Sequence, residues 1–317
     1  RLLTIARRYL SKYALSCGIF WYSSLFCSSF ARIETRCAFS TCRRCYPARS
    51  SYRTKGLTYP SPYKNSSGDS WYQFENVKDD HAFKAISELK ADVFAVASFG
   101  QILPQALLDL APYGAINFHW SLLPKYRGAS PVQAAIIHGD KKIGATIIRM
   151  DAKMDHGDIL SFFEEDVRSE DTADTLYHRL GQKGSTIFPT VLAEYIEGKI
   201  LPQAQKHEEA SFVKLITRED GRLEPTQKTA TELERLIRAY QPWPGTYLEI
   251  EGKRLKVLSG KEGTAKDIPA GSRFVEGGLP AVACKEGTSL ILTSVQPEGK
   301  QAMEGKAYLL GKKDWTS

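Results

Sequence analysis

The stretch Asp92-Val-Phe-Ala-Val-Ala-Ser98 decides the fold class of this chain. It is a continuous apolar run of strand length, which is typical of a parallel β-strand buried on both faces. Gly114-Ala-Ile-Asn-Phe-His119 predicts a second short strand, and Ile143 to Met150 predicts a third. The longest amphipathic helix is expected over Thr172 to Tyr195. Strands that alternate with helices indicate an α/β fold with an open, mainly parallel, Rossmann-like sheet.

The pattern changes after residue 212. Thr229 to Ala239 predicts a helix, and Gln241-Pro-Trp-Pro-Gly245 ends it. Short alternating segments separated by Gly-rich turns follow between Thr246 and Val295, which favours a small OB-like β-barrel. We therefore expect a leader over residues 1–68, a catalytic domain over 69–199, a linker over 200–212 and a second domain over 213–317.

The first 68 residues differ from the rest in charge and in cysteine content. They hold 12 Lys and Arg but one acid, Glu34, whereas the formal net charge of the whole chain is +7. The basic pI therefore does not argue for nucleic-acid binding by the whole chain. A basic, Ser-rich and acid-poor segment is typical of organelle targeting, with a secretory signal or a wrongly assigned start as the alternatives. We expect this leader to direct the protein to the mitochondrial matrix.

Cysteine and apolar residues exclude several other classes of protein. Five of the six cysteines lie in the first 45 residues, so the body has one thiol, Cys284, and no disulfide framework. Cys42-Arg-Arg-Cys45 resembles half a zinc site, but no second pair follows, so we expect no metal. No run of 18 uncharged apolar residues follows residue 33, which excludes a polytopic membrane protein.

One polar cluster suggests chemistry at the end of the second predicted strand. Asn117, His119 and Ser121 are spaced by two residues, so on a strand they share one face. Ligands bind at the carboxyl edge of open α/β sheets, and Asp155 follows the third strand at a turn that faces this edge. An amide and an imidazole can stabilise an oxyanion and move a proton, which suits direct acyl transfer. The alternative is that Asn117 and His119 satisfy each other at a strand end.

Longer strings add a family resemblance between about residues 80 and 311. In the first half they are Phe99-Gly-Gln-Ile-Leu-Pro104, Asn117-x-His119, Ser121-Leu-Leu-Pro-x-Tyr-Arg-Gly-Ala129 and Met150-Asp-x-x-x-Asp155-x-Gly-Asp158. In the second half they are Ile216-Thr-x-Glu-Asp-Gly221, Arg238-Ala-x-x-Pro-Trp-Pro-Gly245 and Gln296-Pro-Glu-Gly-Lys300. The chain resembles the folate-dependent formyltransferase family, and its second half is similar to the C-terminal domain of the branch that formylates methionyl-tRNA.

The resemblance implies that 10-formyltetrahydrofolate donates a formyl group to the free amine of methionyl-initiator-tRNA, for translation initiation. It implies catalytic roles for Asn117, His119 and Asp155. It implies folate contacts for a larger set, namely Phe99, Gly100, Gln101, Ser121, Leu122, Leu123 and Pro124. Basic residues crowd one hairpin region, so we expect Lys253, Arg254 and Lys256 to bind tRNA through its phosphates. We expect a monomer.

The chain also departs from the family at three places. The family opens with a glycine-containing strand, turn and helix, and residues 1–68 show no match, so the first strand of the sheet is expected to be missing. Trp120 and His156 stand where the family usually has small residues. Two alternatives therefore stay open: a formyltransferase for an amino sugar or another small amine, and an inactive paralogue that binds RNA or folate.

Overall fold

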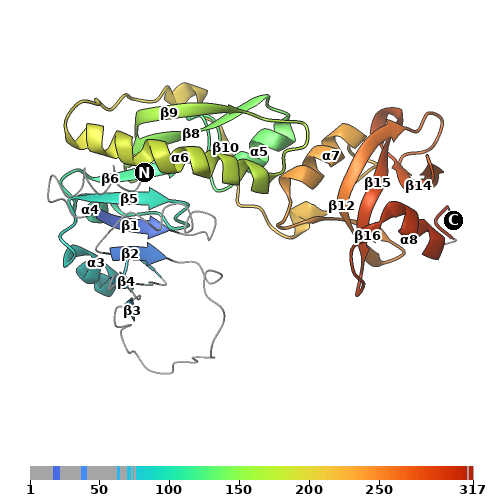
Figure 1. The fold of residues 1–317 in the computed structure, drawn as a ribbon, viewed down its shortest axis with the longest axis horizontal. Helices are drawn as coiled ribbons and strands as arrows, with labels where there is room; N and C mark the ends of the chain where they lie inside the picture. The colour runs from blue at the N-terminus through green and yellow to red at the C-terminus, as the bar shows by residue number, and fades with distance from the viewer. Residues whose placement is uncertain are drawn as a thin grey trace. The chain divides into compact units, whose positions relative to one another are not determined.

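The computed structural model describes residues 17–21, 37–40, 63–64, 70–72, 74, 76–312 and 314–316. The chain divides into two compact units, each with its own β-sheet (Figure 1). The first unit comprises residues 1–129, 144–165 and 177–212, and the second comprises residues 130–143, 166–176 and 213–317. Asn117, His119 and Asp155 therefore belong to the first unit, whereas the basic residues expected to bind tRNA belong to the second.

The sheet of the first unit has eight strands. They are β1 (Cys17–Trp21), β2 (Cys37–Ser40), β3 (Tyr63–Lys64), β4 (Ser70–Tyr72), β5 (Val93–Ala97), β6 (Ala115–His119), β8 (Lys142–Arg149) and β9 (Asp158–Asp166). Their order is β3-β4-β2-β1-β5-β6-β8-β9. The pairs from β4 to β6 are parallel, whereas β3 and β8 run antiparallel to their neighbours β4 and β6. The prediction of an open, mainly parallel sheet is confirmed.

The structure corrects the expectation that the first strand is missing, whereas most of the expected leader, residues 1–68, lies outside the described residues. β1 lies between β2 and β5, and Ile19 pairs with Ala38 on one side and with Ala95 on the other. Its backbone groups are thus paired on both sides, as an interior strand requires. The sequence argument had placed this short apolar run inside a diluted targeting segment. A buried parallel strand has the same composition, so composition could not separate the two.

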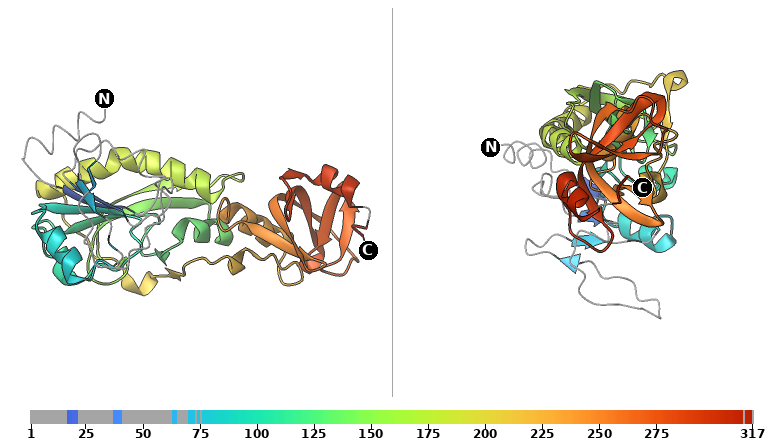
Figure 2. Two further views of the ribbon diagram at one scale, coloured as in Figure 1. Left: turned by 90° about the horizontal axis from the view of Figure 1, so that it is seen from below. Right: turned by 90° about the vertical axis from the view of Figure 1, so that its right-hand side faces the viewer.

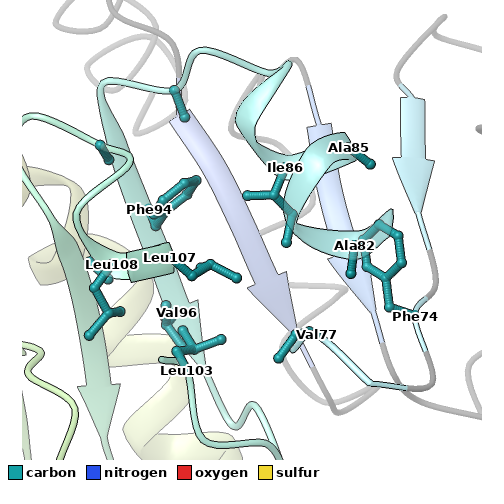
Figure 3. Close-up of a cluster of buried hydrophobic side chains, with 13 residues drawn as sticks. Phe74, Val77, Ala82, Ala85, Ile86, Phe94, Val96, Leu103, Leu107 and Leu108 are labelled. Atoms are coloured by element: carbon teal, nitrogen blue, oxygen red, sulfur yellow. The ribbon is translucent and has the colours of Figure 1, made fainter. Parts of the chain in front are cut away.

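One face of this sheet packs against helices α3 (Asp80–Ser87) and α4 (Gln105–Leu108) (Figure 3). The cluster includes Phe94 and Val96 of β5, Ile86 of α3 and Leu107 of α4, all of which are at most 3% exposed. Burying such a side chain contributes roughly 1.5–3 kcal/mol to stability. This cluster fixes the position of β5 and hence of its neighbour β6.

The opposite face is covered by the long helix α6 (Ala173–Ile196), which appears above the sheet in the left view of Figure 2. Phe118 of β6 points toward α6, because its ring centroid lies 6.2 Å from that of Phe188. The ring also packs against the backbone of Gly184, where an added Cβ would lie only 2.5 Å from Phe118 Cε2. Since neighbouring side chains on a strand alternate, Asn117 and His119 project to the other face, the face of α3 and α4.

A two-stranded sheet pairs β7 (Arg127–Gly128) with β10 (Phe212–Val213). Near β10 lies a 3-10 turn over His207–Glu209. The segment expected to be a linker, residues 200–212, thus packs as part of the first unit. Of the helices in the part of the chain that the structure describes, none combines the length and the apolar character that a bilayer crossing requires.

The second unit contains a curved antiparallel sheet with the order β11-β12-β15-β14-β13, and β16 pairs with β15. The strands are β11 (Thr246–Ile250), β12 (Lys253–Thr264), β13 (Arg273–Glu276), β14 (Leu279–Ala283), β15 (Thr288–Pro297) and β16 (Met303–Glu304). The helices are α5 (Pro131–His138), α7 (Ala230–Ala239) and α8 (Gly305–Gly311). Thr229 and Glu232 form a capping box that starts α7 where the sequence predicts. The barrel-like, all-antiparallel character of this domain agrees with the prediction.

Candidate active site

Asn117 and His119 lie side by side on one face of β6, where the strand ends. They are 8% and 5% exposed, respectively. The Asn117 carboxamide makes no hydrogen bond with any residue that the structure describes. A buried amide is expected to have a partner, and since none of the described residues supplies one, its donor and acceptor suit a polar ligand group. The prediction that the two side chains share a face is confirmed.

His119 is held at both ring nitrogens. Its Nε2 lies 3.0 Å from the carbonyl oxygen of Tyr126. Since a carbonyl oxygen can only accept, Nε2 must carry the hydrogen of this bond. Its Nδ1 lies 3.4 Å from Oδ1 of Asp155. When the imidazole gains a proton at Nδ1, Asp155 is therefore in place to accept the new N–H and to balance the charge.

Asp155 follows β8 in a turn and has a left-handed backbone, with φ of 48°. Its Oδ2 accepts a 2.8 Å hydrogen bond from the backbone N–H of Gly128. Burial raises the pKa of Asp155, but His119, the Gly128 N–H and the Arg127 charge outweigh burial and lower it overall. The carboxylate is therefore ionised at neutral pH, which is the form that can orient His119.

The loop after β6 holds four of the residues expected to contact folate. The Ser121 hydroxyl donates a 2.6 Å hydrogen bond to the Lys125 carbonyl, and the Ser121 carbonyl accepts one from Thr146. Thr146 Oγ1 in turn accepts from the backbone N–H of Leu123 at 3.0 Å. Ser121 is fully buried and its side chain shapes the loop, and its contact with folate stays a prediction. Leu123 is also buried, whereas Leu122 and Pro124 are half-buried.

The other residues expected to contact folate follow β5. The Gln101 side-chain carbonyl accepts a 3.0 Å hydrogen bond from the backbone N–H of Val77. Phe99 packs against the α3/α4 core, and Gly100 is exposed. Within this stretch the side chains of Phe99 and Gln101 are thus engaged by the protein. A folate contact here remains a prediction, for which the exposed Gly100 backbone is the accessible group.

Sequence reasoning did not assign two buried polar residues that border the site, Arg127 and Gln205. Arg127 is 3% exposed and Gln205 is 5% exposed. The Gln205 amide donates a 2.9 Å hydrogen bond to the carbonyl oxygen of Asp155. Arg127 lay inside a matching string, which was a usable signal. Gln205 lay in a polar segment that resembled a linker, and one sequence gives no sign that a linker glutamine is buried.

Two of the three departures from the family pattern, Trp120 and His156, both point away from the His119–Asp155 pair. Trp120 donates a 2.8 Å hydrogen bond to Ser98 and packs edge-on against Phe118, on the α6 side of β6. His156 bonds to Asp151 at 2.6 Å, and its ring stacks on His207 with centroids 3.9 Å apart. His156 therefore does not compete with His119 for Asp155.

The basic residues expected to bind tRNA lie on β12 of the second unit. Lys253, Arg254 and Lys256 are all exposed. The Arg254 guanidinium lies over the ring of Tyr247, 4.5 Å from its centroid. Such a pair presents a positive charge and an aromatic surface together, as nucleic-acid-binding β-domains often do. Among the described side chains, no group of three His, Cys, Asp or Glu residues is arranged to hold a metal ion.

Comparisons with known proteins agree with both halves of the chain. A family model for formyl transferases matches residues 47–192, and one for the formyl transferase C-terminal domain matches residues 215–313. The methionyl-tRNA formyltransferase of Anaeromyxobacter sp. (strain K) is 38% identical over 262 residues, which cover 81% of this chain and 84% of the relative. That of Desulfotalea psychrophila is 36% identical over 271 residues, which cover 84% of this chain and 83% of the relative.

Solved structures share the fold at low identity. Methionyl-tRNA formyltransferase from Clostridium thermocellum matches 92% of this chain over its full length, with a TM-score of 0.56 and 17% identity. An N-formyltransferase from Helicobacter canadensis, in complex with folinic acid and dTDP-3-aminofucose, matches with a TM-score of 0.60 and 15% identity. The match covers 89% of this chain and 99% of that one. HypX from Aquifex aeolicus, in complex with tetrahydrofolic acid, matches with a TM-score of 0.58 and 15% identity. The match covers 94% of this chain and 47% of that one. On the sequence matches to both domains, the chain belongs to the formyl transferase family.

Proposed function

We propose that this protein transfers a formyl group from 10-formyltetrahydrofolate to the α-amine of methionyl-initiator-tRNA. The observation that carries the chemistry is the buried amide of Asn117, which bonds to none of the described residues, beside the His119–Asp155 pair. The choice of acceptor is supported by relatives named methionyl-tRNA formyltransferase, which extend over both units of this chain. Tetrahydrofolate and folinic acid in two solved relatives support a folate as the donor substrate.

In the proposed reaction, the free amine attacks the formyl carbon, which becomes tetrahedral as its oxygen takes up negative charge. The Asn117 N–H donates to that oxygen, and none of the described residues competes for this N–H. Because β6 is packed on both faces, the amide is already in place before charge develops. A donor of this kind is worth roughly 10²–10³ in rate.

His119 and Asp155 manage the proton. The attacking amine must lose one proton, and the leaving N10 of tetrahydrofolate must gain one, so the transfer needs no net acid or base. His119 can take the proton at Nδ1, where Asp155 Oδ1 lies 3.4 Å away, and can then return it. The ionised Asp155 stabilises the imidazolium while the C–N10 bond breaks and the new amide bond remains.

The second unit would supply the grip on tRNA. Lys253, Arg254 and Lys256 are exposed on one strand and can contact phosphates without reading sequence. A small amine such as an amino sugar has no phosphate backbone to be held in this way. The basic strand therefore favours a nucleic-acid acceptor over the small-amine alternative.

The proposal is tested with purified protein, 10-formyltetrahydrofolate and either charged initiator tRNA or a dTDP-amino sugar. Acid-stable formylmethionine is expected on hydrolysis of the tRNA product, and the amino sugar should remain unmodified. The reverse result would establish the small-amine reading. Saturable folate binding without either product would indicate an inactive paralogue.

We further propose that the protein acts as a monomer in the mitochondrial matrix. The basic, acid-poor composition of residues 1–68 supports the location, although β1 and β2 restrict a removable leader to residues before Cys17. A fluorescent protein fused after residue 16 should enter mitochondria, and the same fusion with Arg7 and Arg8 replaced by Glu should not. Light scattering of the purified 317-residue chain, with its leader in place, should give a mass near 35.4 kDa.

A further inference from the structure

Gln205 is a buried residue within residues 203–209, a segment that is otherwise exposed. The backbone of Gln203, two residues earlier, exchanges both hydrogen bonds with Ile159 of β9, at 2.7 and 2.9 Å. This pairing lays the segment beside the turn that contains Asp155. The Gln203 side chain is exposed, whereas Gln205 is 5% exposed. One side chain of this segment is therefore inserted next to the site.

The amide of Gln205 is fully used. Its Nε2 donates to the carbonyl oxygens of Asp155 at 2.9 Å and Gly157 at 2.7 Å. Its Oε1 accepts a 2.6 Å hydrogen bond from Nη2 of Arg127. Only one orientation of the amide satisfies these contacts, because two carbonyls need a donor and a guanidinium needs an acceptor. Gln205 therefore links the Asp155 turn to Arg127.

Arg127 is connected to the Asp155 turn by a second route, through its neighbour Gly128. It directly precedes Gly128, whose N–H donates to the Asp155 carboxylate. Its own backbone N–H donates to the Ser211 carbonyl at 2.8 Å, and Nη2 also lies 2.8 Å from Nδ1 of His207. Asp155 is thus held twice: Gly128 binds its carboxylate, and Gln205 binds its main chain.

The backbone of Asp155 makes this support necessary. A non-glycine residue at φ of 48° is strained by about 1–3 kcal/mol and persists where its surroundings hold it. Without the two donations from Gln205, the turn can relax toward an ordinary conformation, and the 3.4 Å approach of Asp155 to His119 opens. A displacement of about 1 Å in a catalytic group can cost 10²-fold in rate.

We infer that Gln205 is a positioning residue for formyl transfer, which acts by fixing the Asp155 turn against His119 and Gly128. This inference rests on the proposed function of Asp155. Gln205 itself touches neither the formyl donor nor the amine acceptor in this scheme, so its removal should slow turnover without weakening substrate binding.

Gln205→Ala and Gln205→Glu test the role, with Gln203→Ala as the matched control from the same segment. Gln205→Glu keeps the size and the acceptor for Arg127, but it replaces the donor with an oxygen that faces two carbonyls. Both Gln205 variants are expected to lose about 10- to 100-fold in kcat with KM for tRNA and folate within threefold. The acid limb of the kcat profile should move to higher pH, because Asp155 leaves the groups that keep it ionised. Gln203→Ala should match the wild type.

Hydrogen exchange at the Gly128 amide provides a readout that does not depend on activity. Loss of the Gln205 hydrogen bonds to the Asp155 turn should speed this exchange at least tenfold in both Gln205 variants. The exchange should be unchanged in Gln203→Ala. Wild-type kcat in Gln205→Glu, or a KM that rises in step with the loss of kcat, would overturn the inference. If the wild type makes no formyl product, the proposed function fails. Unchanged Gly128 exchange in the Gln205 variants would separately overturn the inference that Gln205 holds the Asp155 turn.

Discussion

Both units of the molecule contain non-glycine residues with a left-handed backbone, and those at the candidate site of the first unit differ in their surroundings from two in exposed turns of the second. In the first unit, the Tyr126 carbonyl binds His119, and the Asp155 carboxylate binds Gly128. In the second unit, Glu251 and Glu286 are exposed, and each directly precedes a glycine that also has positive φ. Glu251 lies in the two-residue turn between β11 and β12, where positive φ suits the twist of a hairpin.

The comparison separates two uses of the same backbone conformation. At Glu251 and Glu286 the conformation belongs to a turn, and any residue that tolerates positive φ can make it. At Asp155 it aims a carboxylate at an imidazole, and buried polar groups hold it there. Strain at Asp155 that is surrounded by buried hydrogen bonds supports the hypothesis of a functional role, whereas the exposed turns at Glu251 and Glu286 give no such support.

Replacement of Asp155 should show the largest effect. Asp155→Asn keeps the size, the tolerance for positive φ and the acceptor for Gly128, but it removes the charge that faces His119. We expect kcat to fall about 10²- to 10⁴-fold with little change in tRNA affinity, measured by formylation kinetics and filter binding. Equal loss of tRNA affinity would show that the turn of the first unit is structural, like those of the second.

The same variant gives a pH test of stability. The folded pKa of Asp155 lies below its ordinary value of 3.8, so this carboxylate stabilises the fold above pH 3.8. That contribution is lost as the pH falls through the lowered pKa. The difference in unfolding free energy between the wild type and Asp155→Asn should therefore shrink as denaturant titrations move below pH 3.8. A constant difference would contradict the ionised, paired state.

Asn117→Ala should have the next largest effect, because it removes one oxyanion donor. We expect a loss of about 10²- to 10³-fold in kcat. Asn76→Ala is a matched control, because Asn76 is exposed and bonds to Asp79. Thermal melting should show that Asn117→Ala folds, since its amide makes no hydrogen bond with the described protein. Full activity in Asn117→Ala would mean that β6 presents this amide for another reason.

Charge reversal on β12 tests the second unit. Replacing Lys253, Arg254 and Lys256 with Glu should raise KM for tRNA about tenfold or more and lower the salt dependence of binding, with kcat unchanged. Lys306→Glu, on α8, serves as the control. A fall in kcat at saturating tRNA would mean that this strand affects the chemistry as well as the grip.

The smallest effect is expected at an exposed turn of the second unit. Glu286→Gly removes the steric cost of positive φ but adds chain entropy to the unfolded state, so stability should change by less than about 1 kcal/mol. Activity should not change. Loss of activity here would break the distinction between the two kinds of left-handed residue.

Much of this fold follows from local patterns. The run Val93–Ala97 was recognisable as a buried parallel strand, and Asn117 and His119 share a face because side chains alternate. β1 was not recognisable, because its apolar residues are also those of a targeting segment. Local patterns therefore located the strands of the body but not the sheet's full width.

The candidate site was predictable to the extent that its residues lie at strand ends. Asp155 was expected to face His119, and the structure brings them together at 3.4 Å. Gln205 was hidden because its burial depends on a pairing between Gln203 and Ile159, residues 44 positions apart. Ser121 matches a family string, yet its hydroxyl donates a hydrogen bond to the Lys125 carbonyl. Only the geometry of the loop reveals this bond. Long-range pairing and loop shape are the parts that periodicity does not encode.

The contact between Phe118 and Gly184 makes the site sensitive to a substitution that touches none of its polar residues. A single methyl group added on α6 would collide with the Phe118 ring and press on the strand from behind. The residues flanking that ring in sequence are the amide donor and the imidazole. We therefore expect Gly184→Ala to disturb formyl transfer from the opposite side of the sheet, by displacing the Phe118 ring.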